Sequence, residues 1–237
     1  LAAGAAAAIT PALLARSRWM SRGPDGAAAA PLDPDAWRTP AGSVDPTLGS
    51  VKPASTPLKL LVLGGTAFLG PHAVEYALAR GHEVTLFNRG KTNPHLFPTV
   101  EKILGKRQAD FYKLRGRSWD AVIDTWTRYP SAVRAAAELL RDQVGHYLFV
   151  STISVYKIGR EPLDESSAVM TPSEPPPENQ DLRNYGPLKV PSEQAAEQAM
   201  PGRVTVVRPG VIAGPGDPTD RFTYWPVRLA RGGQVRS

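Results

Sequence analysis

The sequence contains no cysteine, only four histidines and no long hydrophobic run. Without cysteine the chain cannot form disulfides, use a thiolate nucleophile or bind a metal through sulfur. The histidines are scattered, and no two of them have the spacing of metal ligands, so we expect no metal site. No apolar run reaches the length of about 20 residues that a transmembrane helix needs, so we expect no stable membrane span.

The chain has 237 residues, of which 42% are hydrophobic, and this is enough for one α/β core with additional segments. Its formal net charge is +6. A positive balance favours anionic partners such as nucleotides, phosphates or nucleic acid. A basic surface that only keeps a protein in solution has the same composition, so charge alone leaves both interpretations open.

The chain divides into three segments by composition. Residues 1–15 are small and apolar and are similar to the hydrophobic core of an export signal. Their alanine-rich, weakly hydrophobic character favours the twin-arginine route to the periplasm. An ordinary N-terminus on a cytoplasmic protein is the alternative. Residues 16–57 are rich in Pro, Gly, Ala, Ser and Asp without periodicity, which predicts a disordered linker, and residues 58–237 form the predicted domain.

The domain begins with an apolar run, residues 60–63, that breaks into a glycine-rich turn and is followed by a helical pattern. Strand, glycine turn and helix in this order are typical of dinucleotide binding, because a pyrophosphate must approach bare backbone and the N-terminus of the helix. A tight turn without a ligand is the alternative. The predicted cofactor-binding residues of this turn are Gly64, Gly65, Thr66, Ala67, Phe68, Leu69 and Gly70.

Short apolar runs then alternate with helical patterns. The expected strands are residues 84–87, 100–104, 121–123, 147–150 and 204–207, and an alanine-rich helix is expected over 132–140. Continuous apolar strands separated by amphipathic helices predict an α/β fold, a doubly wound parallel sheet of the Rossmann type. Its ligands bind at the carboxyl ends of the strands. The proline-rich stretch 162–177 is expected to be a loop.

Tyr185 and Lys189 are four residues apart, so on a helix they share one face. A phenol has an unperturbed pKa near about 10 and is a poor proton carrier at neutral pH, but a neighbouring ammonium lowers that pKa. Pro191 lacks the N–H that would bond the carbonyl of Pro187. The helix is therefore expected either to kink at Pro191 or to start there.

These motifs resemble the extended branch of the short-chain dehydrogenase/reductase superfamily, the NAD-dependent epimerase/dehydratase family, over residues 57–237. The family usually has Gly-x-x-Gly-x-x-Gly, and here Ala67 replaces the middle glycine, which narrows the room beside the pyrophosphate. Extended members continue into a substrate lobe where this chain stops at Ser237, and the chain starts without Met. We therefore expect a fragment whose C-terminal lobe is largely missing.

The resemblance also implies site residues after the fifth strand. Residues 151–156 resemble the family's Ser-Ser-x-x-Val-Tyr pattern, so that Ser151 contacts cofactor and Thr152 holds the reacting oxygen. Tyr185 then transfers the proton, and Lys189 tunes it and holds the nicotinamide ribose. Family dehydratases have an Asp-Glu pair after the threonine, whereas this chain has Ile153 and Ser154. Dehydration is therefore disfavoured.

The residues that follow the second strand indicate whether the cofactor is NAD or NADP. NAD-binding proteins usually have an acid there, whereas an arginine accommodates a 2′-phosphate. This chain has Asn88, Arg89 and Lys91, so NADP is favoured over NAD. Further residues that the resemblance implies are Asp110 at the adenine, Asp124 beside the nicotinamide, and Arg221, Tyr224 and Trp225 at the substrate.

The leading interpretation is an NAD(P)-dependent oxidoreductase or epimerase that acts on a carbinol carbon through Thr152, Tyr185 and Lys189. A nucleotide sugar is the substrate class that the resemblance most often implies. The alternative is a non-catalytic NAD(P)-binding or RNA-associated protein, because some family members with a Gly-Gly-Thr-x-Phe-(Leu/Ile)-Gly turn, the chloroplast stem-loop RNA-binding proteins, associate with RNA. The chain has no run of basic residues interleaved with aromatics, which argues against nucleic acid.

Overall fold

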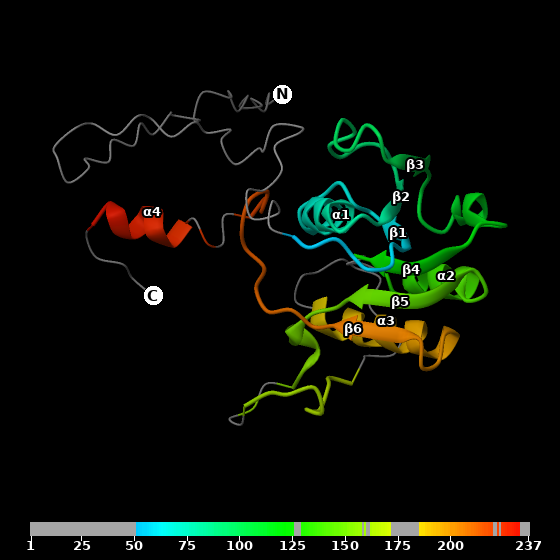
Figure 1. Cartoon of the computed structure of the whole chain (residues 1–237). Coiled ribbons are helices and arrows are strands. Elements are labelled where there is room, and N and C mark those ends of the chain that lie inside the picture. The colour runs from blue at the N-terminus through cyan, green and yellow to red at the C-terminus, as the bar shows by residue number, and fades with distance from the viewer. Residues whose placement is uncertain are drawn as a thin grey trace, which may run out of the picture. The chain divides into compact units, whose positions relative to one another are not determined.

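The computed structural model describes residues 51–125, 129–157, 159, 162–171, 185–219, 222 and 224–232. All of these residues belong to one compact unit, Pro40–Ser237 (Figure 1). The predicted export signal of residues 1–15 and most of the predicted linker lie outside the described residues.

A six-stranded parallel sheet forms the centre of this unit, with strand order β3-β2-β1-β4-β5-β6. The order reverses between β1 and β4, and ligands of open α/β sheets bind in the crevice at such a switch point. The predicted doubly wound sheet is thus confirmed. The strands are β1 (Lys59–Leu63), β2 (Glu83–Asn88), β3 (Glu101–Leu104), β4 (Trp119–Asp124), β5 (Val144–Val150) and β6 (Val204–Val207).

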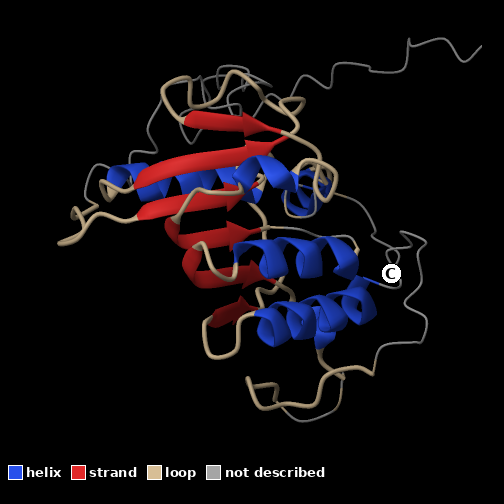
Figure 2. Ribbon diagram, turned by 90° about the vertical axis from the view of Figure 1, so that its right-hand side faces the viewer, coloured by secondary structure: helices blue, strands red, loops and turns tan. Residues whose placement is uncertain are grey.

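Helices cover both faces of the sheet. In β1, Leu60 and Val62 pack in the cluster that contains residues of α1, while Leu61 and Leu63 pack in the cluster that contains residues of α2 and α3. Figure 2 shows α2 and α3 lying side by side. Strands that are buried on both faces need apolar residues at every position, which explains their continuous apolar runs. The helices are α1 (Leu69–Ala79), α2 (Pro130–Leu140), α3 (Tyr185–Ala199) and α4 (Tyr224–Ala230), with short 3₁₀ helices η2 (Phe111–Leu114) and η3 (Ile153–Val155).

Helix α3 begins at Tyr185 and continues through Pro191, so the expectation that it starts late, at Pro191, is wrong. Proline removes one hydrogen bond of the helix, and Ser192 bonds back to the preceding turn through its hydroxyl, which donates to the carbonyl of Leu188 at 3.0 Å. The buried face of α3 packs against η3 and α2. This packing keeps Tyr185 and Lys189 on one continuous helix.

The proline-rich loop is described over residues 162–171, which contain no helix, and Val169 forms an isolated antiparallel bridge with Tyr156. The rest of the stretch lies outside the described residues. Among the described helices, none combines the length and the apolar character needed to cross a membrane.

Candidate active site at the carboxyl edge of the sheet

The glycine turn connects β1 to α1 through backbone that other residues rarely adopt. Gly64 and Gly65 have φ values of 127° and 90°. A Cβ on Gly65 would lie 2.7 Å from Leu86 Cδ2, and one on Gly70 would lie 2.6 Å from the carbonyl carbon of Gly65. The first turn of α1 therefore packs directly on the turn. No side chain caps the start of α1 and its first turn has no acid, which suits an anion at this helix N-terminus.

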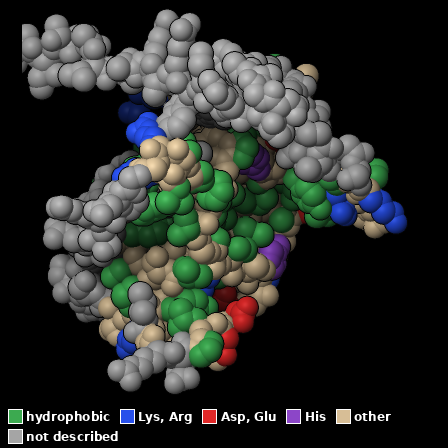
Figure 3. Space-filling view, turned by 90° about the vertical axis from the view of Figure 1, so that its left-hand side faces the viewer, with side chains coloured by type: hydrophobic (Ala, Val, Ile, Leu, Met, Phe, Trp, Pro, Cys, Tyr) green, Lys and Arg blue, Asp and Glu red, His purple; other side chains and the backbone are tan. Residues whose placement is uncertain are grey.

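The other predicted residues of the turn divide by exposure. Thr66 is buried, Phe68 and Leu69 are half-buried, and Ala67 is exposed. The methyl group of Ala67 is thus on the surface of the turn, where a ligand would approach. Figure 3 views the edge of the sheet where the carboxyl ends of the strands lie, and it shows hydrophobic side chains gathered around a hollow.

The loop after β2 is tied to the glycine turn. Asn88 donates to the carbonyl of Gly64 at 3.1 Å and accepts from the N–H of Gly90 at 2.8 Å. Asn93 donates to the carbonyl of Thr66 at 3.0 Å. The side chains of Arg89 and Lys91 are exposed beside these bonds. A neutral amide with its oxygen already bonded therefore stands where an NAD-binding acid is expected.

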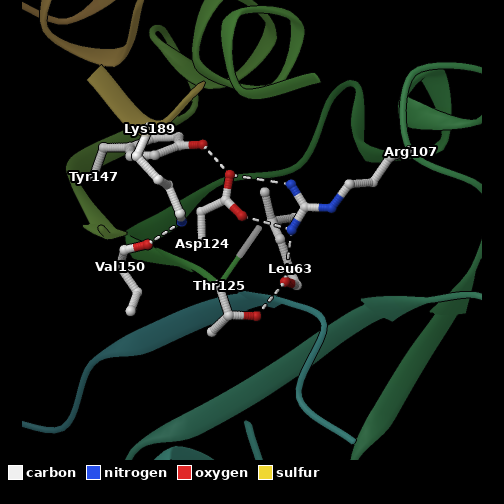
Figure 4. A network of polar contacts seen from close by, with 7 residues as sticks. All are labelled: Leu63, Arg107, Asp124, Thr125, Tyr147, Val150 and Lys189. Carbon is white, nitrogen blue, oxygen red and sulfur yellow. Dashed lines mark hydrogen bonds and ion pairs between the residues drawn. The ribbon is translucent and has the colours of Figure 1, made fainter. Parts of the chain in front are cut away.

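A buried ion pair crosses the switch point (Figure 4). Asp124, at the end of β4, has no exposed surface, and its carboxylate accepts from Arg107 Nη2 at 2.5 Å, from Arg107 Nη1 at 3.1 Å and from the Tyr147 hydroxyl at 2.6 Å. Arg107 also donates to the carbonyl of Leu63 at 2.8 Å. Burial, and secondly the Asp124 charge, raise the pKa of Tyr147 well above its usual value, so its hydroxyl remains a donor.

Lys189 lies next to this pair, and its side chain is buried. Its ammonium donates to the carbonyl of Val150 at 2.6 Å and lies 4.5 Å from the ring centroid of Phe149 and 5.8 Å from that of Tyr185. Burial lowers the pKa of Lys189 to about 8, against the attraction of Asp124 and Glu193. The structure therefore brings Tyr185 and Lys189 together at the end of β5, as the four-residue spacing predicts.

Ser151 and Thr152 follow β5 and have separate partners. Ser151 donates to the Glu193 carboxylate, which also accepts from Arg208 Nε at 3.1 Å and Nη2 at 2.7 Å. The hydroxyl of Thr152 caps η3 by accepting from the N–H of Ser154 at 3.2 Å and donates to the Ser154 hydroxyl at 3.2 Å. Ser151 thus belongs to a buried ion-pair network, while Thr152 holds the backbone that follows β5.

The family described as NAD dependent epimerase/dehydratase matches residues 60–235, most of the chain. The chain belongs to this family. The matched residues include the glycine turn, the switch point and the Tyr185–Lys189 pair.

The names of the similar proteins indicate more than one kind of function. A curated relative, the chloroplast stem-loop binding protein of 41 kDa b from Arabidopsis thaliana, is 27% identical over 124 residues, which cover 44% of this chain and 31% of the relative. Among solved structures, the Bordetella bronchiseptica enzyme WbmH in complex with NAD+ is 20% identical with a TM-score of 0.54, covering 76% of this chain and 64% of that one. The UDP-Glc/GlcNAc 4-epimerase from Campylobacter jejuni is 18% identical with a TM-score of 0.51, covering 63% and 52%.

These structural likenesses establish the fold. The chain spans about a third of the length of the curated relative and about half to two thirds of the two structures.

The other predicted residues of the family site have partners of their own or lie outside the described residues. Asp110 precedes η2 and accepts from the N–H of Lys106 at 2.7 Å, a bond that lowers the pKa of Asp110 and organises its own loop. Tyr224 and Trp225 begin α4, are about half exposed and contact each other with ring centroids 5.2 Å apart. Arg221 lies outside the described residues.

Three residues of the site were not singled out by sequence as site residues: Arg107, Tyr147 and Glu193. Glu193 could have been found, because it lies four residues after Lys189 on the same face of α3. Arg107 gives no signal, since it follows β3 in a polar loop and its partner Asp124 is 17 residues away.

Proposed function

We propose that this chain is an NAD(P)-dependent oxidoreductase or epimerase that acts on a carbinol carbon. The observation that supports this most is the Tyr185–Lys189 pair, in which a buried ammonium lies 5.8 Å from the phenol ring at the carboxyl edge of the sheet. Membership of the NAD dependent epimerase/dehydratase family supports an NAD-dependent reaction of this kind. The solved UDP-sugar epimerases with this fold favour a nucleotide sugar as the substrate.

The residues have distinct roles in this proposal. Tyr185 removes the proton from the substrate hydroxyl, and the Lys189 ammonium stabilises the phenolate that drives this transfer. The Thr152 hydroxyl donates to the substrate oxygen in place of its bond to Ser154. Ile153 and Ser154 carry no acid–base pair for the loss of water, so reduction, oxidation or epimerisation is favoured over dehydration.

The residues of the glycine turn fit a dinucleotide. The bare backbone at Gly64 and Gly65 and the uncapped start of α1 suit a pyrophosphate, and Lys189 suits the nicotinamide ribose. When bound, NAD(P) would itself act as the acceptor and the donor of the hydride. The proposed preference is for NADP, because the loop after β2 carries Arg89 and Lys91 and has no acid.

Turnover of a panel of nucleotide sugars by the full-length protein tests the catalytic proposal. Tyr185→Phe should abolish turnover while cofactor binding stays nearly intact, because the change removes only the hydroxyl. Exposed Tyr76→Phe on α1 is the matched control and should retain activity. Turnover that survives in Tyr185→Phe would contradict the proposed role.

An RNA-associated protein is the second candidate, and the name of the Arabidopsis relative favours it. Filter binding of a stem-loop RNA at increasing salt separates the two functions. A set of real phosphate contacts gives an affinity that falls steeply with salt. Steep, saturable RNA binding without any turnover would favour this candidate.

A further inference from the structure

Arg107, Asp124 and Tyr147 form a cluster in which Asp124 and Tyr147 are buried, and the catalytic roles proposed above do not use it. It joins the ends of β1 and β4, the middle of β5 and the loop after β3, because Arg107 also bonds the carbonyl of Leu63. A buried carboxylate and guanidinium cost free energy unless each satisfies the other. Here the two-point contact and the Tyr147 hydroxyl fix the Asp124 carboxylate in one orientation.

This fixed carboxylate lies beside Lys189. Figure 4 shows the Lys189 ammonium between the Val150 carbonyl and Asp124. Among the described residues, the charged groups that act on it are Asp124 on β4, Glu193 on α3 and Arg107 in the loop after β3. The titratable side chains beside it are Tyr185 on α3 and Tyr147 on β5, which is bonded to Asp124. Glu193 is itself held by Arg208 and Ser151.

We propose that Asp124 is a positioning residue for Lys189: its carboxylate, fixed by Arg107 and Tyr147, holds the ammonium at the end of β5, while the Arg107 charge opposes that attraction. This inference rests on the proposed function, in which Lys189 acts on Tyr185. It assigns to Asp124 an effect on the proton-transfer pair that does not require contact with the cofactor.

Asp124 and Arg107 must shift the pKa of Lys189 in opposite directions. Asp124 attracts the ammonium and favours its charged form, whereas Arg107 repels it and disfavours that form. Removing one charge at a time should therefore move the titration of Lys189 in opposite directions. A change that only loosens the packing would move both variants the same way, towards the ordinary value of an exposed lysine.

The test is an NMR titration of the Cε signal of Lys189 in the full chain labelled with ¹³C-lysine, assigned by its loss in Lys189→Met. In Asp124→Asn the midpoint should fall by about one unit or more, the size expected for a lost neighbouring charge. In Arg107→Gln it should rise. Midpoints that move in the same direction, or that stay unchanged in both variants, would overturn the proposal.

Arg107→Gln leaves a buried carboxylate without its partner and can prevent folding. The neutral double variant Arg107→Gln/Asp124→Asn then decides the question, since its midpoint should lie above that of Asp124→Asn alone. A midpoint equal to or below that of the single variant would overturn the proposal. The titration needs neither cofactor nor substrate, so its failure is distinguishable from failure of the catalytic proposal, which the Tyr185→Phe experiment tests.

Discussion

Lys189 brings an ammonium group into the interior of the domain, where water does not stabilise its charge. The Val150 carbonyl, the Phe149 ring and two carboxylates compensate only in part, because the pKa of Lys189 is still lowered from 10.5 to about 8. The charged form is thus retained at neutral pH at a cost in stability. Such a cost is common where a residue serves function rather than folding.

This cost predicts that Lys189→Met stabilises the protein at neutral pH. Between about pH 8 and pH 10.5 the unfolded chain binds more protons than the folded one, so the stability of the wild type rises with pH across that window. Lys189→Met should raise the free energy of unfolding at pH 7 by roughly 1–3 kcal/mol, less than the full linkage value because the Val150 carbonyl loses its donor. The advantage should shrink by about pH 10.

Urea unfolding of both proteins at the two pH values measures this effect. Lys52→Met, which changes an exposed lysine, is the control and should differ little from the wild type at either pH. A Lys189→Met protein that is less stable at pH 7, or whose difference from the wild type does not depend on pH, would contradict the cost assigned to the buried ammonium.

The place of a single residue in the site could be predicted from sequence where the pattern that indicates it is local. The Tyr185–Lys189 pair was found because spacing on a helix fixes which side chains share a face. The Arg107–Asp124 contact depends on how the loop after β3 crosses the end of β1, and no local pattern encodes that path. Ser151 was predicted from the resemblance to contact cofactor, and that role stays a prediction, since the structure shows it bonded to Glu193.

At the scale of elements, the contact between α3 and η3 sets the position of Tyr185. Gly186 lies in the first turn of α3, and a Cβ there would lie 2.0 Å from the carbonyl oxygen of Ser154 and 2.8 Å from Met170 Cε. Only glycine allows this close approach of the helix to the backbone after β5. The same approach brings Tyr185 towards the segment that carries Thr152.

Gly186→Ala should therefore separate α3 from η3. We expect the free energy of unfolding to fall by about 1–3 kcal/mol, the usual cost of overpacking, and turnover to fall with it. Gly159→Ala is the control, because a Cβ at Gly159 meets nothing within 4 Å. Thermal unfolding of the two variants measures the difference, and equal stabilities would refute the close contact.

The elements themselves were largely predictable, because buried parallel strands give apolar runs and glycine marks the turn between β1 and α1. The predicted strand 204–207 has the bounds of β6, β3 is one residue shorter than the predicted 100–104, and the other four strands are longer by one to three residues. The start of α3 was left open by sequence, since Pro191 removes one hydrogen bond. Packing of the buried face of α3 against α2 and η3 outweighs that loss.

At the scale of the whole molecule, we propose that residues 1–15 direct export by a twin-arginine-like route, which carries folded proteins and would let the domain cross with its cofactor bound. The full-length protein should then appear in the periplasmic fraction with this segment removed. A variant without residues 1–15 should stay in the cytoplasm. Recovery of the full-length protein only in the cytoplasm, with its N-terminus uncleaved, would refute export.

Dinucleotide binding is the property on which the proposed chemistry depends, and calorimetric titration of the full chain with NAD and with NADP measures it directly. We expect saturable binding of one dinucleotide per chain, tighter for NADP, with the preference narrowed in Arg89→Ala. Binding should be lost in Gly65→Val, whose side chain would clash with Leu86 at a positive φ. A folded wild-type protein that binds neither dinucleotide would contradict the dinucleotide site. So would a Gly65→Val variant that binds the dinucleotides as tightly as the wild type does.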